Sequence, residues 1–265
     1  MKVGQIDILP IFDGVGQEKA DEVLTRPDVP DAWACHTGQL DDHGVLHLPL
    51  GGFLVRTGER VVLVDAGVGT IDNGKYAGGK FLQSLAGHGI VPADVTDVVF
   101  THLHFDHVGW ATSKGEVVFP NATYRVHAAD WAHFVESPDA LPGAVRKLSP
   151  LESRLETFDR DQILAPGLSA RHTPGHTPGS TVFVVADGDR RALLLGDVVH
   201  SVVELHERDW EAVFDVDPVA ARAVRNAIAD EVADSTDLVV GAHFPGLRFG
   251  RVVTAFGNRS FQQIV

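Results

Sequence analysis

The chain has 265 residues, of which 44% are hydrophobic and 22% charged, and its net charge at pH 7 is −14. That length is enough for one large domain or two small ones with a full core. An acidic chain disfavours nucleic acid and anionic membranes, because both need clustered lysine and arginine, so we expect neither as a partner.

The sequence carries no sign of membrane insertion or export. It has no run of about 18 apolar residues, so we expect no transmembrane helix. The N-terminal stretch MKVGQIDILP lacks the apolar core and cleavage site of a signal peptide. The single cysteine, Cys35, excludes an intramolecular disulfide and fits a reducing compartment. These features predict a cytoplasmic protein.

The predicted elements mix strands and helices along the chain. In order, β-branched and apolar runs predict strands at 2–12, 51–57, 60–67, 97–102, 122–128, 168–174, 180–188, 190–197 and 237–243, the last clear strand. Helices are expected at 75–88, 128–135, 141–158 and after Asp217, the predicted N-cap of a helix with Pro218 at its first position.

Residues 14–48 are the least regular part, and we expect a long arm or loop there. We treat the chain as one domain over 1–265. Its mixture of elements predicts sheets covered by helices in a layered α/β arrangement.

The stretch THLHFDHVGW, residues 101–110, places three histidines and an aspartate within six positions. In an extended H-x-H pair the alternate side chains point the same way, so His102 and His104 can bind one ion. Asp106 and His107 follow as the chain turns and can face a second ion. Side chains at this density compete for the same protons, and the imidazoles repel one another once charged, which points to a metal.

Three further polar residues follow predicted strands, where ligands collect in layered α/β folds. They are His176 in HTPGHTPGS, Asp197 at the end of ALLLGD, and His243 at the end of DLVVGAH. One ion typically takes about three or four ligands, so this set suits two ions that share Asp197. His176 then belongs to the first ion and His243 to the second. The alternative, surface or core histidines without metal, is disfavoured by the dense spacing.

With its downstream residues, the HLHFDH string resembles the metallo-β-lactamase fold hydrolases. VDAGVG, which places Asp65 behind the metal site, and TPGHTPGS also resemble segments of that superfamily. The resemblance implies an αββα sandwich with the metals at one edge. It extends from about residue 45 to residue 245 and is specific for the superfamily but not for a substrate.

Two subgroups look closest, the acyl-homoserine lactonases and the methyl parathion hydrolase-like group. The first shares the HLHFDH string, and the second is similar across GDVVHSVVEL, FDVDP and GAHFPG. Lactonases usually have a tyrosine three residues after the bridging aspartate, where this chain has His200. That departure favours the second subgroup, whose members often carry histidine there.

The implied enzyme is a hydrolase with two divalent metal ions per chain. The ligand types favour Zn²⁺ and leave Fe, Mn or Co open. Two cations can lower the pKa of a shared water from about 15.7 to near neutrality, and the hydroxide attacks a lactone, an ester or an organophosphate triester. Asp106 and His200 are the predicted catalytic residues: Asp106 accepts a proton and His200 donates a hydrogen bond to the oxyanion.

The expected substrate is small, uncharged and partly hydrophobic. Residues 14–48 are expected to supply a pocket wall or a homodimer contact, and both alternatives stay open. Among other residues, we expect Phe105 and Trp110 at the pocket, because they flank the ligands. His127 and His172 are expected to be structural.

Other functions remain as alternatives. The same fold supports a thioesterase, a phosphodiesterase, or a metal-binding sensor without catalysis. GTIDNGKY, from Gly69, matches a phosphate-binding loop only in part, because Tyr76 replaces the Ser or Thr that binds Mg²⁺. We therefore expect a loop there and no nucleotide site.

Overall fold

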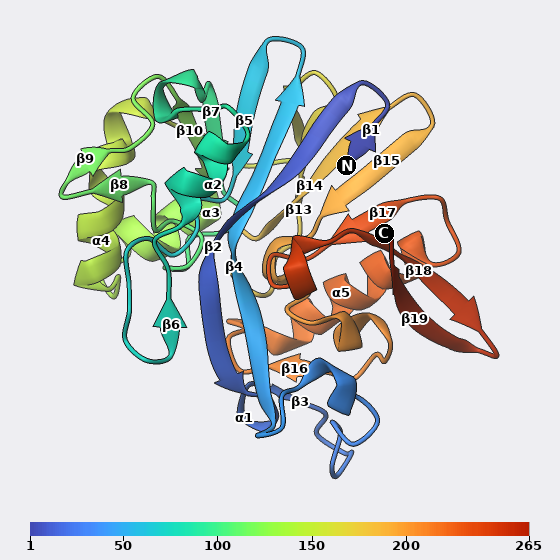
Figure 1. The fold of residues 1–265 in the computed structure, drawn as a ribbon. Coiled ribbons are helices and arrows are strands. Elements are labelled where there is room, and N and C mark those ends of the chain that lie inside the picture. The colour runs from blue at the N-terminus through green and yellow to red at the C-terminus, as the bar shows by residue number, and fades with distance from the viewer. Residues whose placement is uncertain (265) are drawn as a thin grey trace.

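Two β-sheets lie face to face in the computed structural model, which describes residues 1–264 (Figure 1). The first sheet has eight strands: β1 (Lys2–Val3), β2 (Ile6–Lys19), β4 (Val45–Thr57), β5 (Arg60–Val64), β6 (Tyr76–Ala77), β7 (Asp97–Val99), β10 (Thr123–His127) and β11 (Leu155–Phe158). The second has seven: β12 (Gln162–Ala165), β13 (Leu168–His172), β14 (Thr181–Asp187), β15 (Arg190–Leu194), β17 (Leu238–Val240), β18 (Gly250–Ala255) and β19 (Asn258–Gln263).

Helices cover the outer faces of the two sheets. They are α2 (Phe81–Gly87), α3 (Ala128–Trp131), α4 (Pro142–Leu148) and α5 (Pro218–Val232). The short helix α1 (Ala20–Val23) lies instead at the far end of β2. Figure 1 shows α2, α3 and α4 on the side of the first sheet and α5 on the side of the second. Two short ribbons complete the fold: β3 (Leu24–Thr25) pairs with β16 (Glu211–Ala212), and β8 (Thr112–Ser113) pairs with β9 (Glu116–Val117). The predicted layered α/β arrangement is confirmed.

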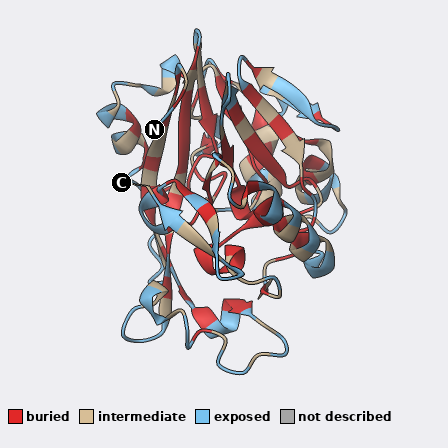
Figure 2. Ribbon diagram, turned by 90° about the vertical axis from the view of Figure 1, so that its right-hand side faces the viewer, coloured by how far each residue is buried: buried red, intermediate tan, exposed pale blue. Residues whose placement is uncertain are grey.

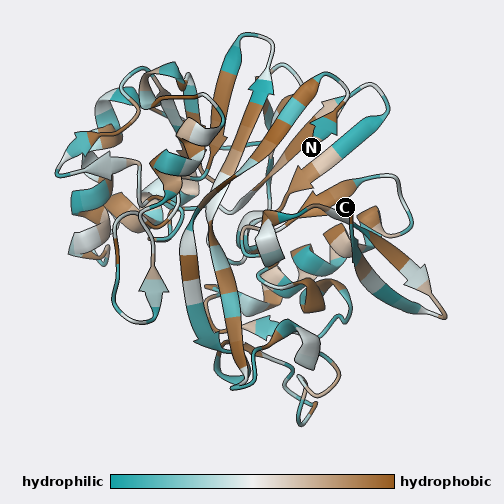
Figure 3. Ribbon diagram, in the orientation of Figure 1, coloured by the Kyte–Doolittle hydropathy of each residue, from teal (hydrophilic) through white to brown (hydrophobic). Residues whose placement is uncertain are grey.

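The first sheet contributes side chains to two hydrophobic cores, one on each of its faces. On β5, Val62 and Val64 face the second sheet, while Leu63 packs with Phe81 and Leu85 of α2. Successive side chains of a strand point to opposite faces, so this run supplies both cores at once. Figure 2 shows the buried residues concentrated on the facing strands, and Figure 3 shows the same strands as the most hydrophobic part of the molecule.

The N-cap of α5 is confirmed. The Asp217 side chain accepts a hydrogen bond from the backbone N–H of Ala220, 3.0 Å away, and Pro218 is the first helical residue. Among residues 1–264, no helix is both long and apolar enough to cross a bilayer.

Several predicted boundaries are wrong. Residues 14–19 and 45–48 are not irregular, because they pair as the far halves of β2 and β4. The predicted helix 75–88 begins at Phe81, after the short strand β6. The predicted helix 141–158 ends at Leu148 and gives way to a 3₁₀ turn and then to β11. Residues 237–243 do not contain the last strand, since β18 and β19 follow.

Candidate metal centre

Strand ends bring the predicted ligands to one edge of the two sheets. β5, β7 and β10 run parallel in the first sheet, and β15 and β17 run parallel in the second, so their carboxyl ends lie together. All seven residues predicted as ligands meet there: His102, His104, Asp106, His107, His176, Asp197 and His243.

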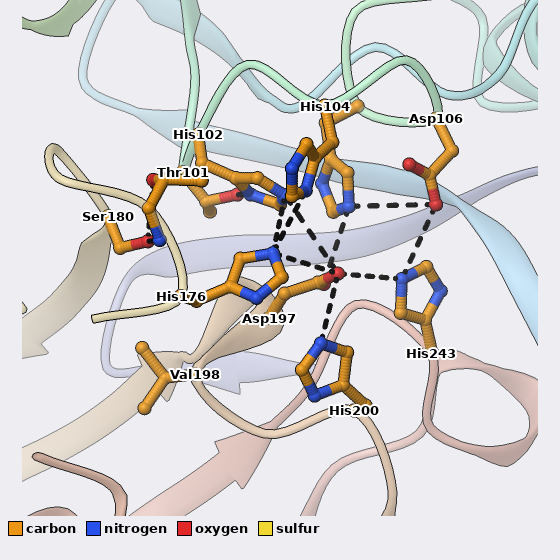
Figure 4. A network of polar contacts seen from close by, with 12 residues as sticks. Thr101, His102, His104, Asp106, His176, Ser180, Asp197, Val198, His200 and His243 are labelled. Carbon is orange, nitrogen blue, oxygen red and sulfur yellow. Dashed lines mark hydrogen bonds and ion pairs between the residues drawn. The ribbon is translucent and has the colours of Figure 1, made fainter. Parts of the chain in front are cut away.

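The first group of candidate ligands contains His102, His104 and His176. Nε2 of His102 lies 3.0 Å from Nδ1 of His104, and Nε2 of His176 lies 3.2 Å and 3.0 Å from those two atoms. His102 and His176 are buried, and all three ring nitrogens point at one spot (Figure 4). This arrangement suits a single cation.

The second group contains Asp106, His107 and His243, and Asp197 lies between the two groups. Asp197 Oδ1 is 3.3 Å from His107 Nε2, and its Oδ2 is 3.1 Å from His243 Nε2. The same Oδ2 is 3.8 Å from Nε2 of His176 in the first group. Figure 4 shows Asp197 at the centre of these contacts, as expected for a carboxylate shared by two ions.

In the first group, the inward-facing Nε2 atoms of His102 and His176 carry no hydrogen. The Thr101 hydroxyl donates to Asp65, so it accepts from Nδ1–H of His102, 3.1 Å away. Asp215 accepts from Nδ1–H of His176 at 3.0 Å. These partners assign both protons to Nδ1, which leaves two bare Nε2 lone pairs facing each other. A cation between them removes the repulsion, so the group fits a metal.

The second group shows the same feature. The Nδ1–H of His107 donates to Asp65 at 2.9 Å, and that of His243 donates to the carbonyl of Pro49 at 2.9 Å. Both Nε2 atoms then face the Asp197 carboxylate, and His107 Nε2 and Asp197 Oδ1 are buried without a hydrogen-bond partner. The Asp197 carboxylate therefore needs a positive charge beside it, which either a metal cation or protons on the two rings can supply.

The pKa shifts of the histidines differ between the first and the second group of ligands. Burial, together with neighbouring imidazoles, lowers the pKa of His102 and His104 well below the usual value, so both rings are neutral at pH 7. Neutral imidazole is the form that binds a metal. For His107 and His243, burial opposes the charged form, but the carboxylates of Asp197 and Asp106 outweigh it and raise the pKa.

Asp65 and Asp130 hold the loops that carry the histidines. Asp65 follows β5 in a left-handed conformation (φ 61°), and it also accepts the backbone N–H of Thr101 at 2.8 Å. Asp130 joins the two histidine loops, since it accepts from the N–H of Leu103 and from the hydroxyl of Thr177. Burial raises the pKa of Asp130 to about 6. The sequence placed Asp65 behind the site but did not indicate Asp130.

His200 is buried beside the two groups. Its Nε2 lies 3.8 Å from Asp197 Oδ2, and both ring nitrogens have no hydrogen-bond partner. Burial opposes the charged ring, yet the Glu204, Asp197 and Asp215 carboxylates raise the pKa of His200 to about 9. The structure thus brings His200 to the site with an unused nitrogen, and Glu204 and Asp215 are neighbours that sequence reasoning missed.

A hollow of about 150 Å³ opens above the clustered ligands. Its apolar wall consists of Leu48, Tyr76, Phe105 and Phe214, and its floor includes His104, His200 and Asp197. Larger hollows of about 840 and 620 Å³ lie elsewhere, but the predicted metal ligands line only the smallest of these three, so it is the candidate active site.

Of the two aromatic residues that flank the predicted ligands in the sequence, only one lies at the hollow. Phe105 lies at the hollow as expected, with its ring 5.1 Å from that of Tyr76. Trp110 does not, because its Nε1–H donates to buried Asp13 at 3.0 Å and its ring packs on the core beneath α2. His127 and His172 stack on each other with ring centroids 3.8 Å apart, outside the cluster.

Sequence comparison places this geometry in a known family. The model of the metallo-beta-lactamase superfamily matches residues 52–243. Over 232 residues the chain is 31% identical to the metallo-beta-lactamase domain-containing protein 1 of Mus musculus, which covers 85% of this chain and 74% of that protein. It is 29% identical over 152 residues to an N-acyl homoserine lactonase of Bacillus sp. That match covers 51% of this chain and 57% of that enzyme.

Solved structures share the whole fold. The hydrolase AbOPH of the beta lactamase superfamily superposes with a TM-score of 0.85 at 26% identity, over 100% of this chain and 95% of that one. The dizinc quorum-quenching lactonase AidC superposes with a TM-score of 0.87 at 23% identity, over 100% of this chain and 96% of that one. With its matched residues running from β4 to His243, the chain belongs to the metallo-beta-lactamase superfamily.

Proposed function

We propose that this protein is a dinuclear metal-dependent hydrolase that opens a lactone or cleaves an uncharged ester. The observation that carries the proposal is the position of Asp197 between two groups of three candidate ligands, whose nitrogen and oxygen atoms converge on one another. That donor set of imidazoles and carboxylates favours Zn²⁺.

In this proposal, His102, His104 and His176 hold one ion, Asp106, His107 and His243 hold the other, and Asp197 is shared. Two bound cations would polarise the scissile carbonyl and supply a hydroxide near neutral pH. The protein's own part is to fix the ligand rings, since an outer partner at Nδ1 directs Nε2 inward in four of the five ligand histidines: His102, His107, His176 and His243.

His200 is placed to interact with the reacting oxygen. It lines the hollow, its Nε2 is unpartnered, and it sits three residues beyond Asp197. An N–H donor here would stabilise negative charge that develops on the carbonyl oxygen. Asp106, whose side chain is 12% exposed, is the carboxylate at the rim and the acceptor we propose for a proton.

The walls of the hollow support a small, uncharged, partly hydrophobic substrate. Leu48, Tyr76, Phe105 and Phe214 present apolar surface directly above a polar floor. About 150 Å³ is well below the roughly 300–1,000 Å³ typical of sites for drug-sized ligands, so only the reacting end of a larger substrate fits inside. The lactonase relatives favour a lactone as the first class to test.

The test is hydrolysis by zinc-loaded protein of an acyl-homoserine lactone, an aromatic lactone, an aryl ester and a methyl phosphotriester, each beside a chelated sample. Bound zinc is counted on the same preparation. Asp197→Asn and His104→Ala are compared with His43→Ala, which changes an exposed histidine in the arm. We expect two zinc ions per wild-type chain, and turnover that chelation and the first two variants abolish.

Turnover of the phosphotriester alone would replace the lactone with that substrate class and keep the metal chemistry. Full activity in Asp197→Asn, or activity that survives complete removal of metal, would refute the dinuclear proposal. His43→Ala should behave like the wild type in every assay.

A further inference from the structure

Arg225 is one of the largest fully buried side chains in the protein, although it carries a charge. It projects from the middle of α5, and its side chain is 2% exposed. A charged group is rarely buried to this degree unless paired. Two carboxylates, Glu204 and Asp215, surround it, and both side chains are 0% exposed.

The guanidinium contacts four points behind the metal centre. Nη1 lies 2.8 Å from Glu204 Oε1, as an ion pair rather than an aligned hydrogen bond, and donates to the carbonyl of Val198 at 3.1 Å. Nη2 donates to the carbonyl of Trp210 at 3.0 Å and lies 3.7 Å from Asp215 Oδ2. One planar group thus ties α5 to four points of the segment that connects β15 to α5.

Three of these four contacts lead to a residue of the candidate site. Asp215 orients the ring of His176 through Nδ1 at 3.0 Å. Glu204 Oε2 accepts the backbone N–H of His200 and lies 3.6 Å from its ring Nδ1. Val198 directly follows Asp197 in the chain. The guanidinium therefore stands behind His176, His200 and Asp197 at once.

We propose that Arg225 is a positioning residue, whose guanidinium holds Asp215, Glu204 and the carbonyl of Val198 so that His176, His200 and Asp197 face the metals. This inference rests on the proposed metal-dependent function.

A role in stability alone would leave this arrangement unexplained. Replacing buried ion clusters with apolar side chains is often neutral or stabilising, so such a cluster is weak evidence for a stabilising role. Arginine is required here by geometry, because its planar fork can reach two carbonyls and two carboxylates together. Lysine supplies one flexible ammonium in its place.

The test compares Arg225→Met and Arg225→Lys with Arg222→Met, a matched change one turn earlier on α5. Arg222 pairs with Glu211 and is 35% exposed, away from the ligands. Zinc affinity is measured by chelator competition without substrate, folding by circular dichroism and thermal melting, and ligand geometry by the visible spectrum of cobalt-loaded protein.

We expect Arg225→Met to fold but to bind at least one zinc ion about 10- to 100-fold more weakly, as loss of an outer partner typically does. Its cobalt spectrum should change and kcat should fall more than KM rises. Arg225→Lys should recover part of the affinity, and Arg222→Met should match the wild type.

Wild-type zinc affinities and cobalt spectrum in folded Arg225→Met would overturn the inference and leave the proposed function intact. If that variant does not fold, Arg225→Lys decides in the same way: weaker zinc binding supports the inference, and unchanged binding and spectrum overturn it. A wild-type chain that binds no zinc would refute the proposed function and this inference together.

Discussion

Oδ2 of Asp65 lies 2.9 Å from Nδ1 of His107, and both side chains are nearly inaccessible to solvent. The aspartate reaches the histidine from a left-handed backbone conformation at the end of β5, a region that residues other than glycine, asparagine and aspartate seldom adopt. Its two oxygens also accept the N–H and hydroxyl of Thr101. Asp65 therefore links the end of β5 to the start of the histidine loop.

Asp65→Asn should separate the charge from the backbone conformation, because asparagine tolerates a positive φ. Its amide can still accept the N–H of Thr101, but it presents N–H to His107 in place of an acceptor. We expect zinc affinity to fall about 10- to 100-fold with little change in thermal stability. Asp65→Ala, the comparison variant, should lose both zinc affinity and thermal stability. Chelator competition and melting measure the two effects, and unchanged zinc binding in Asp65→Asn would contradict the assignment.

Removal of metal should destabilise the protein. Without a cation, the lone pairs of His102 and His176 face each other, and His107 and His243 each need a proton at Nε2 to pair with Asp197. At a free zinc concentration a thousandfold above Kd, one bound ion stabilises the folded state by about 4 kcal/mol. Urea unfolding with added zinc and with chelator should therefore give clearly different midpoints. Identical midpoints, with zinc content verified, would mean that these groups bind no metal in the folded state.

The sequence predicted the ligands because they repeat at short spacing or follow recognisable strands. His102 and His104 are two residues apart, and HLHFDH is specific enough to indicate its chemistry from one stretch. The groups behind the ligands have no such spacing. Asp215 and Arg225 come from a loop and a helix far along the chain from His102, and only the packing of the second sheet brings them to the site.

The errors in the fold have a similar origin. β2 was cut short in the prediction because Gly14 and Gly16 interrupt its apolar pattern. In the structure, a Cβ at Gly16 would lie 2.8 Å from the ring of Tyr76, so the glycine leaves room for the residue that walls the hollow. A long-range contact of this kind has no local signal. Similarly, the sequence of β19, NRSFQQ, is mostly polar and gave no strand pattern, although it pairs with β18.

Asp13 should be among the most sensitive positions for stability. This buried carboxylate accepts backbone N–H groups from the loop before α2, at Val68, Gly69, Gly79 and Phe81, and the indole of Trp110. Asp13→Ala leaves these donors without an acceptor, at about 1–3 kcal/mol for each one that water cannot reach. We expect a loss of at least about 3 kcal/mol in urea unfolding. Asp42→Ala, at an exposed position, is the control. A loss below about 1 kcal/mol would show that the loop keeps its conformation without the Asp13 carboxylate.

Asp97, far from the metal centre, should make stability depend on acid. Its carboxylate is 2% exposed and accepts from Arg60 Nε at 2.7 Å and from the Thr96 hydroxyl at 2.6 Å, with Arg125 also paired to it. Burial opposes ionisation, but these donors outweigh it, so the pKa of Asp97 lies below its usual value. A lowered pKa in the folded state means that the folded chain binds fewer protons than the unfolded chain.

This shift stabilises the protein above the unfolded pKa of about 3.9, and the stabilisation is lost as pH falls through the lower, folded pKa. Because the pKa of Asp97 is lowered in the folded state, this carboxylate stabilises the protein more at pH 7 than at pH 2. Asp97→Asn removes the titration. The free-energy difference between wild type and Asp97→Asn, from urea unfolding at several pH values, should be constant above about pH 5 and shrink below about pH 4. The other carboxylates are present in both proteins, so their contributions cancel in that difference. A difference that stays constant down to pH 2 would mean that the arginines do not lower the pKa of Asp97.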